Sequence, residues 1–301
     1  MNNNRENIIT LTVNPALDLH IRKEGDTEVL LRRDSGGKGV NVSRALRAAD
    51  TDNLCVLVLG EECADGFLRL LVSEGLRLDF VTVKGRVREN KNIQEGERER
   101  VLRGRGPAVD SAAVARLREK LLPRVGEGTY LCFSGRISDG SDKRGILDLL
   151  REAKDRGARL VLDSVSLTAL DLKELRPYMI KPNLEEAEAL LGRPLGESDT
   201  QAACRELLSL GASYVLLTLG SAGMLMATPG GVYRKKGVEI DPVSTTGAGD
   251  SAVAGFLAGK ARDMGDIDTL TLALAFASAA CLAEGSQPPH PCQIKEIYVH
   301  N

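Results

Sequence analysis

The sequence predicts an α/β protein with a mostly parallel central sheet. From residue 54 onward, short apolar runs of strand length alternate with helical patterns, which is typical of βαβ units. The chain has 301 residues, of which 43% are hydrophobic, so that it can bury one large core. Neither a tandem repeat nor a linker divides it. We therefore expect a single domain over residues 1–301.

The first apolar run, Ile8–Val13, predicts a buried strand that ends at Asn14–Asp18. Pro15 cannot continue a helix and keeps Asn14 extended. This places Asn14 and Asp18 at the carboxyl edge of a strand, where open α/β sheets bind ligands. A capped turn is the alternative interpretation.

A glycine-rich turn follows a charged segment, residues 19–33, that predicts a hairpin standing off the main body. Gly36, Gly37 and Gly39 surround Lys38 and lead into a helical pattern. Backbone N–H groups in such a turn favour anion binding, although the P-loop spacing is absent. A plain glycine turn before a helix is the alternative.

The middle of the chain predicts regular strands and helices. The strands are expected at 54–60, 79–83, 129–133, 160–163, 178–180 and 215–218, and the helices at 65–74, 110–122, 142–156, 184–191 and 200–210. The arginine-rich segment 85–107 interrupts this rhythm and predicts a solvated β-ribbon. One or two of its guanidinium groups are candidates for a substrate phosphate.

The C-terminal part carries the motif with the clearest chemistry. Short strands at 224–227, 232–235 and 238–240 lead to Ser244–Ser251, and helices are expected at 251–261, 267–283 and 293–299. A glycine turn before a helix leaves N–H groups free for an anion. Asp250 would repel a bound phosphate unless it acts as a general base beside a transferring phosphoryl group.

Two other interpretations of this motif remain at this point. Gly247 and Gly249 can form a tight turn with Asp250 as a helix cap. The spacing Gly247-x-Gly249-x-x-Ala252 also matches a loose dinucleotide fingerprint. That match is weak because the motif lies near the C-terminus and would set Asp250 against a pyrophosphate.

Composition excludes several classes of function. The net charge of −2 gives no general case for binding nucleic acid or a membrane surface. The six cysteines form no C-x-x-C pair, and three histidines are too few for a histidine-based metal centre. No signal segment or run of membrane-helix length occurs. We expect a cytoplasmic protein that acts on small molecules.

Five motifs in order along nearly the whole chain resemble those of the PfkB carbohydrate kinases, and most closely those of the 1-phosphofructokinase and tagatose-6-phosphate kinase branch. They are Thr12–Asp18, Gly36–Val42, Ile180–Glu186, Thr218–Gly223 and Ser244–Ser251. The resemblance implies a ribokinase-like three-layer α/β/α fold with a mostly parallel central sheet. It also implies a small β-lid formed by residues of about 19–35 and 86–107, through which a homodimer is possible.

The resemblance implies a role for each motif. Asp250 is expected to be the general base, with the backbone of Gly247, Ala248 and Gly249 holding the anion of the transition state. Asn183 and Glu186 are expected to organise Mg²⁺, largely through water. The residues expected to bind ATP are Lys181, Asn183, Glu186, Thr218, Gly220, Ser221, Ala222, Gly223, Gly249 and Asp250. Those expected to bind the sugar phosphate are Asn14, Asp18, Gly37, Lys38, Gly39, Asn41, Arg88 and Arg136, with Lys38 and Arg88 assigned to its phosphate.

The implied reaction is the MgATP-dependent phosphorylation of a ketohexose phosphate, first of all fructose 1-phosphate to fructose 1,6-bisphosphate. Tagatose 6-phosphate and fructose 6-phosphate are the alternative substrates. An NAD(P)-dependent dehydrogenase and a non-catalytic sugar-phosphate sensor are rivals of other classes. The chain departs from the family pattern at Ser134–Gly140, at Asp163–Ser166 and in its short lid segments, all of which bear on sugar choice and lid closure.

Overall fold

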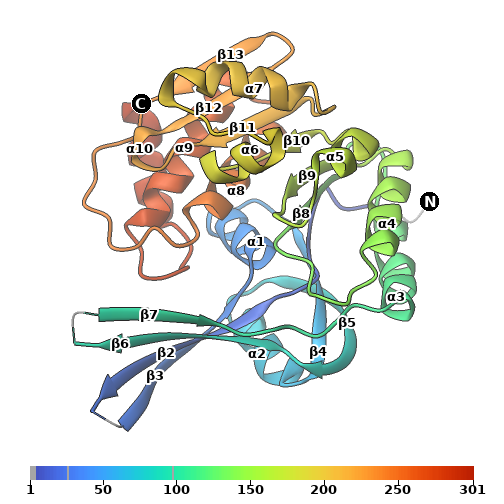
Figure 1. The fold of residues 1–301 in the computed structure, drawn as a ribbon, viewed down its shortest axis with the longest axis vertical. Coiled ribbons are helices and arrows are strands. Elements are labelled where there is room, and N and C mark those ends of the chain that lie inside the picture. Colours follow the sequence, from blue (N-terminus) through green and yellow to red (C-terminus); the bar gives the residue numbers. More distant parts are fainter. Residues whose placement is uncertain (1–4, 26, 97) are drawn as a thin grey trace.

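A nine-stranded sheet forms the centre of the computed structural model, which describes residues 5–25, 27–96 and 98–301 (Figure 1). Its strand order is β13-β12-β11-β10-β9-β8-β1-β4-β5. The strands β1 to β11 of this sheet pair in parallel, and β12 and β13 add an antiparallel edge. Their bounds are β1 Ile8–Thr12, β4 Leu54–Glu62, β5 Arg77–Arg86, β8 Tyr130–Ser134, β9 Arg159–Asp163, β10 Met179–Ile180, β11 Tyr214–Thr218, β12 Met224–Thr228 and β13 Gly231–Lys235.

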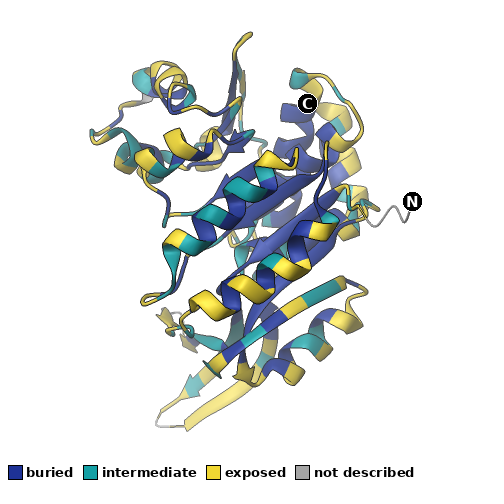
Figure 2. Ribbon diagram, turned by 90° about the vertical axis from the view of Figure 1, so that its right-hand side faces the viewer, coloured by how far each residue is buried: buried dark blue, intermediate teal, exposed yellow. Residues whose placement is uncertain are grey.

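Helices cover both faces of this sheet and give three layers. One face packs against α1 Lys38–Ala48, α2 Ala64–Ser73, α8 Ala248–Ala261, α9 Asp266–Cys281 and α10 Pro291–His300. The other packs against α3 Ser111–Leu121, α4 Lys143–Asp155, α5 Ala169–Leu175, α6 Leu184–Leu191 and α7 Thr200–Leu208. Alternate residues of β1 point to opposite cores, and every residue of the strand is buried. Figure 2 shows buried strands of the central sheet behind helices whose outer sides are exposed. The predicted three-layer α/β fold with a mostly parallel sheet is confirmed.

A second sheet projects from the body as the lid and has the order β3-β2-β6-β7 (Figure 1). Its strands are β2 Ala16–Glu24, β3 Thr27–Gly36, β6 Arg88–Glu95 and β7 Arg98–Arg103. Parallel pairing of β2 with β6 joins two segments that lie far apart in the sequence. The hairpin starts at Ala16 rather than Leu19, so that Asp18 lies on the lid sheet and not at the edge of the central sheet.

The junction between the two sheets is closely packed. Glu62 of β4 pairs with Arg86 of β5, and the chain passes directly from there into β6. A Cβ atom added to Gly60 would clash with the backbone of Arg86 and Val87. Because only glycine lets the two backbones approach this closely, Gly60 fixes where the lid leaves the body.

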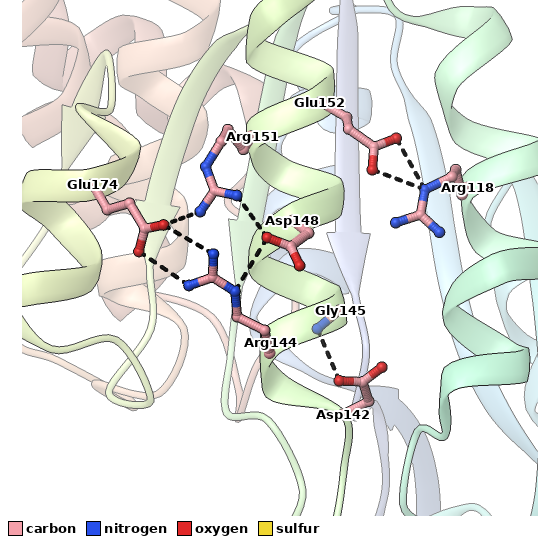
Figure 3. A network of polar contacts seen from close by, with 8 residues as sticks. All are labelled: Arg118, Asp142, Arg144, Gly145, Asp148, Arg151, Glu152 and Glu174. Atoms are coloured by element: carbon pink, nitrogen blue, oxygen red, sulfur yellow. Dashed lines mark hydrogen bonds and ion pairs between the residues drawn. The ribbon is translucent and has the colours of Figure 1, made fainter.

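Ion pairs connect the helices of one outer layer (Figure 3). Arg118 of α3 donates to Glu152 of α4, and Arg144 and Arg151 of α4 both contact Glu174 of α5. Exposed pairs of this kind stabilise a protein by at most about 1 kcal/mol each. The apolar core beneath them, rather than these pairs, therefore holds the layer in place.

The local structure differs from the sequence-based expectations in three places. Residues 238–240 form no strand, because the backbones at Gly223 and Gly237 pack against each other and the chain leaves the sheet edge after β13. Helix α5 was not predicted, since it is short and depends on the capping box between Thr168 and Asp171. Helix α8 begins at Ala248, not at Ser251.

Candidate active site

The candidate site lies where the order of the parallel strands reverses. β1 sits between β8 and β4, and the chain runs from β1 to β4 on one side and later to β8 on the other. In open α/β sheets the carboxyl ends of strands at such a switch point form the ligand-binding crevice. The lid sheet rises from this edge, because β2 follows β1 directly.

Asp250 lies in the first turn of α8, whose N-cap is Gly247 with a left-handed φ of 82°. Asp250 is thus the third residue of the helix and not its N-cap. It accepts a hydrogen bond of 2.8 Å from the Asn41 side chain of α1 and is only 7% exposed. The interpretation of Asp250 as a helix cap is therefore wrong, and the carboxylate faces the crevice between the two helices.

The pKa of Asp250 is raised to about 7: burial and, after it, the neighbouring carboxylate of Asp163 raise it, and the opposing effects of Lys38, Asn41 and Lys181 only partly offset them. A carboxylate whose pKa lies near neutrality is well matched to general-base catalysis. The charges around Asp250 thus favour a role in proton transfer.

Asp163 is a site residue that the sequence reasoning missed. It ends β9, is 1% exposed, and accepts a hydrogen bond of 2.9 Å from Lys38 Nζ. Lys181 Nζ lies 3.5 Å from the same oxygen, and the second oxygen of Asp163 is buried without a hydrogen-bond partner among the described residues. Its place at the end of a buried parallel strand was the signal that could have identified it.

The turn before α8 has the geometry of an anion site. The N–H groups of Gly249 and Asp250 belong to the first turn and have no intrahelical acceptors, while the N–H of Ala248 donates to the Thr245 carbonyl at 3.4 Å. A Cβ atom on Gly249 would lie 3.4 Å from Lys181 Nζ, so that an ammonium group stands beside this turn. Helix dipole and lysine together favour negative charge here.

Two cavities meet at this point. One of about 550 Å³ extends over the turn before α8, and another of about 740 Å³ lies under the lid. Lys38 and Asp250 line both cavities. A ligand in one cavity can therefore meet a ligand in the other beside the Asp250 carboxylate, where a chemical group can be transferred between them.

Comparison with known proteins agrees with this geometry. Residues 11–292 match the description "pfkB family carbohydrate kinase". The chain belongs to this family. It is 31% identical to a 1-phosphofructokinase of Haloferax volcanii, covering 94% of this chain and 93% of the relative. It is 28% identical to a tagatose-6-phosphate kinase of Staphylococcus epidermidis, covering 89% and 90%.

The crystal structure of phosphofructokinase-2 from Escherichia coli in complex with substrates and products has the same fold as this pfkB family kinase. The TM-score is 0.88 at 24% identity, covering 97% of this chain and 98% of that chain. In the described part of the kinase, no helix is both long and apolar enough to cross a membrane.

In this pfkB family kinase the residues predicted to bind the nucleotide lie together around the 550 Å³ cavity, with one exception. Ala222 is exposed in the short 3-10 helix Gly220–Ala222 and does not line the cavity. Apolar side chains form another wall, from Met224, Val238, Ile240, Pro242, Leu274 and Ala277. The predicted nucleotide-binding residues that line the cavity are Lys181, Asn183, Glu186, Thr218, Gly220, Ser221, Gly223, Gly249 and Asp250, and Gly247 and Ala248, which were predicted to hold the transition-state anion, line it as well.

Asn183 and Glu186 cap α6 reciprocally. The Asn183 side chain accepts a hydrogen bond of 2.8 Å from the Glu186 N–H, and Glu186 Oε2 accepts one of 3.0 Å from the Asn183 N–H. Glu186 Oε1 lies 3.6 Å from Lys38 Nζ. With one oxygen of each side chain engaged by the helix, the pair fits a magnesium ion held through water better than one held directly. The free oxygen of Asp163 adds an acceptor on this side.

The predicted sugar-binding residues divide into two groups. Asp18, Lys38 and Asn41 line the 740 Å³ cavity, and Asp18 accepts a hydrogen bond of 2.7 Å from Asn90 of β6. Within the part of the chain that the structure describes, the side-chain oxygens of Asn41 and Asn90 are buried without partners, as expected for groups that hydrogen-bond sugar hydroxyls. Asn90 was not predicted as a site residue, although it lies in the arginine-rich segment 85–107.

Asn14, Gly37, Gly39, Arg88 and Arg136 do not line the two cavities. Gly37 starts α1 with a φ of 124°, and a Cβ atom on Gly39 would clash with the Thr12 hydroxyl, so that both glycines shape the turn below Lys38. Asn14 is buried at the base of the lid.

Arg88 lies on the same face of β6 as Asn90, and its buried Nε has no partner in residues 5–25, 27–96 and 98–301. Burial lowers the pKa of Arg88, Asp18 raises it, and Arg103 and Arg136 lower it further, so the three guanidinium groups lie near one another. The Arg136 side chain is 62% exposed and pairs with Asp139. Guanidinium groups that gather in this way favour an anion beside them.

Proposed function

We propose that this pfkB family kinase transfers the γ-phosphoryl group of ATP to a ketohexose phosphate, and that its main reaction converts fructose 1-phosphate to fructose 1,6-bisphosphate. The observation that carries the proposal is the position of Asp250. Its buried carboxylate lies at the junction of an anion-binding cavity and a polar cavity under the lid.

In this mechanism Asp250 takes the proton from the sugar hydroxyl as its oxygen attacks the γ-phosphorus. The N–H groups at the start of α8, together with the ammonium group of Lys181, stabilise the charge that spreads over the transferring group. Lys38 Nζ, held by Asp163, stands beside the same carboxylate. This position favours contact with the transferring group rather than with the substrate's own phosphate.

Magnesium, bound near Asn183 and Glu186 through water, would neutralise charge on the ATP phosphates. The apolar wall formed by Met224, Leu274 and Ala277 suits the adenine ring. We assign the substrate's own phosphate to Arg88 and its neighbouring arginines, at the base of the lid and away from Asp250.

The alternative substrates are tagatose 6-phosphate and fructose 6-phosphate, the former supported by the likeness to a tagatose-6-phosphate kinase. A dehydrogenase is disfavoured because Asp250 would face a pyrophosphate at the glycine turn. A non-catalytic sensor is disfavoured because the base is present and buried in a suitable environment.

The deciding experiment is an ADP-release assay with MgATP and fructose 1-phosphate, fructose 6-phosphate, tagatose 6-phosphate and unphosphorylated fructose in parallel. We expect the highest kcat/KM with fructose 1-phosphate. Equal turnover of unphosphorylated fructose would contradict the phosphate site, and no turnover of any sugar would contradict kinase activity.

We also propose that the chain is one domain, that it acts in the cytoplasm, and that it forms a homodimer through the lid. Exposed apolar side chains on both outer strands of the lid support the homodimer; they are Val29, Leu30, Leu31, Val101 and Leu102. Sedimentation equilibrium of the protein and of a Leu30→Lys variant tests it. A monomeric wild-type protein would contradict it.

A further inference from the structure

An ion pair joins the lid to the loop after α9. Arg32 of β3 donates a hydrogen bond of 3.2 Å to Glu284, a residue 252 positions away in the sequence. Arg32 also donates to Asp34 at 2.9 Å, and Asp34 lies 2.9 Å from His20 of β2. The lid side of the contact is therefore held in place by a second carboxylate on the lid itself.

The loop packs against the lid beyond the ion pair. Gly285 has a left-handed φ of 58°, and a Cβ atom there would lie 3.4 Å from Arg32 Nη2 and 3.6 Å from His20 Cε1. His20, Arg32, Glu284 and Gly285 all line the 740 Å³ cavity. The contact thus closes one side of this 740 Å³ cavity, which we assign to the sugar phosphate and call the sugar-side cavity.

The same loop also contacts the anion-binding turn. The carbonyl of Cys281 accepts hydrogen bonds from the N–H groups of Val243 at 2.8 Å and Ser244 at 3.2 Å, just before the turn. A Cβ atom on Gly247 would lie 3.6 Å from the Cα of Ser286. Residues 281–286 comprise the last residue of α9 and the loop after it, and we name them the bridging loop. They therefore touch both the lid and the turn at the start of α8.

We propose that Arg32 and Glu284 are positioning residues that hold the lid closed over the sugar-side cavity and couple its closure, through the bridging loop, to the anion-binding turn. The proposal rests on the proposed sugar-phosphate kinase function. The Glu284 side chain is 76% exposed and that of Arg32 37%, so water and salt weaken the pair. Such a pair can shift the balance between open and closed lids without locking it.

The first test measures amide hydrogen exchange in the lid strands β2 and β3 without any substrate. Glu284→Gln should speed exchange there by about two- to fivefold, the range expected for an exposed pair. High salt should speed exchange in the wild-type protein toward the level of the variant and leave the variant unchanged. Glu95→Gln, which removes the pairing of Glu95 with Lys23 within the lid, is the matched control. It should not speed amide exchange in β3.

The second test is a double-mutant cycle on the KM for the sugar phosphate. Glu284→Gln should raise this KM by about two- to fivefold and leave the dissociation constant of ATP, measured without sugar, unchanged. In an Arg32→Gln background, which also loses the contact with Asp34, the further change Glu284→Gln should have no effect.

Unchanged lid exchange in Glu284→Gln, or additive effects of the two substitutions, would overturn the proposal. If no sugar phosphate is turned over, the proposed function fails, while the exchange experiment still tests the closure of the lid. The two hypotheses are thereby distinguished.

Discussion

The side-chain amide of Asn41 donates a hydrogen bond of 2.8 Å to the carboxylate of Asp250. The two residues come from opposite ends of the chain, and each lies in the first turn of a helix that begins with a glycine of positive φ. The hydrogen bond therefore fixes the orientation of the proposed base relative to the sugar-side cavity, which both residues line.

The Asp250→Asn variant should lose most of its activity. Without a base for the sugar hydroxyl, kcat should fall by several orders of magnitude, about 10³-fold or more. The dissociation constant for ATP, measured by calorimetry, should stay nearly unchanged because the N–H groups of the turn remain. Near-normal turnover would remove Asp250 from the mechanism.

The pH dependence of kcat/KM should report the ionisation of Asp250. Since the pKa is raised to about 7, activity should fall as the pH drops below that value and the base becomes protonated. Asp163→Asn removes a charge that raises this pKa and should move the acid limb to lower pH. Lys38→Met removes a charge that lowers it and should move the limb to higher pH. Shifts in the same direction would contradict this arrangement of charges.

Stability should depend on pH through the same group. The folded protein binds a proton at Asp250 below about pH 7, whereas the unfolded chain binds it only near the ordinary value of 3.8, so the free energy of unfolding falls as pH rises through this window. Asp250→Asn removes the buried charge. Its Tm relative to the wild-type protein should therefore be higher at pH 8 than at pH 5, and calorimetric scans at the two pH values measure this difference.

Arg88→Ala should raise the KM for the sugar phosphate about tenfold or more, since a charge-assisted contact to phosphate is lost. The KM for ATP should hardly change, because Arg88 acts on Asp18, which lines the 740 Å³ cavity under the lid and not the 550 Å³ cavity. Arg86→Ala is the control: this exposed arginine pairs with Glu89. Equal effects of the two substitutions would indicate a general effect of lid charge rather than a phosphate contact.

Two glycines of helices should respond in opposite ways to alanine. A Cβ atom on Gly255 of α8 would lie 2.7 Å from Cα of Ala273 in α9, so Gly255→Ala should destabilise the protein by about 1–3 kcal/mol. Gly66 of α2 has open space around its Cα, and Gly66→Ala should stabilise it by about 0.4–1 kcal/mol. Urea denaturation of both variants measures the difference, and a stabilised Gly255→Ala variant would contradict the close helix packing.

The sequence was sufficient to predict the fold and the glycine turn before α8, because apolar runs and glycine turns are local signals. β1 and the turn at Gly247 both lie where the pattern places them. The motif order, through the family resemblance, added what local patterns could not show, namely which turn carries the proposed base.

The sequence was insufficient where contacts join distant segments. The bond between Asp163 and Lys38 spans 125 positions, and neither residue type alone reveals it. The parallel pairing of β2 with β6 likewise depends on how two separate segments leave the central sheet. Arg88 was singled out, but its relation to Arg103 follows only from the folded lid.

The pairing of β2 with β6 has a consequence for how new substrates can arise in this scaffold. Asp18, Asn90 and Asn92 face the sugar-side cavity from the lid, whereas Asp250, Lys181 and the turn at Gly247 belong to the body. Exchanging the lid strands between relatives should therefore retarget the acceptor while the phosphoryl donor and the base remain the same. The lid would then determine which sugar is accepted, and the body would keep the same phosphoryl donor and the same proposed base.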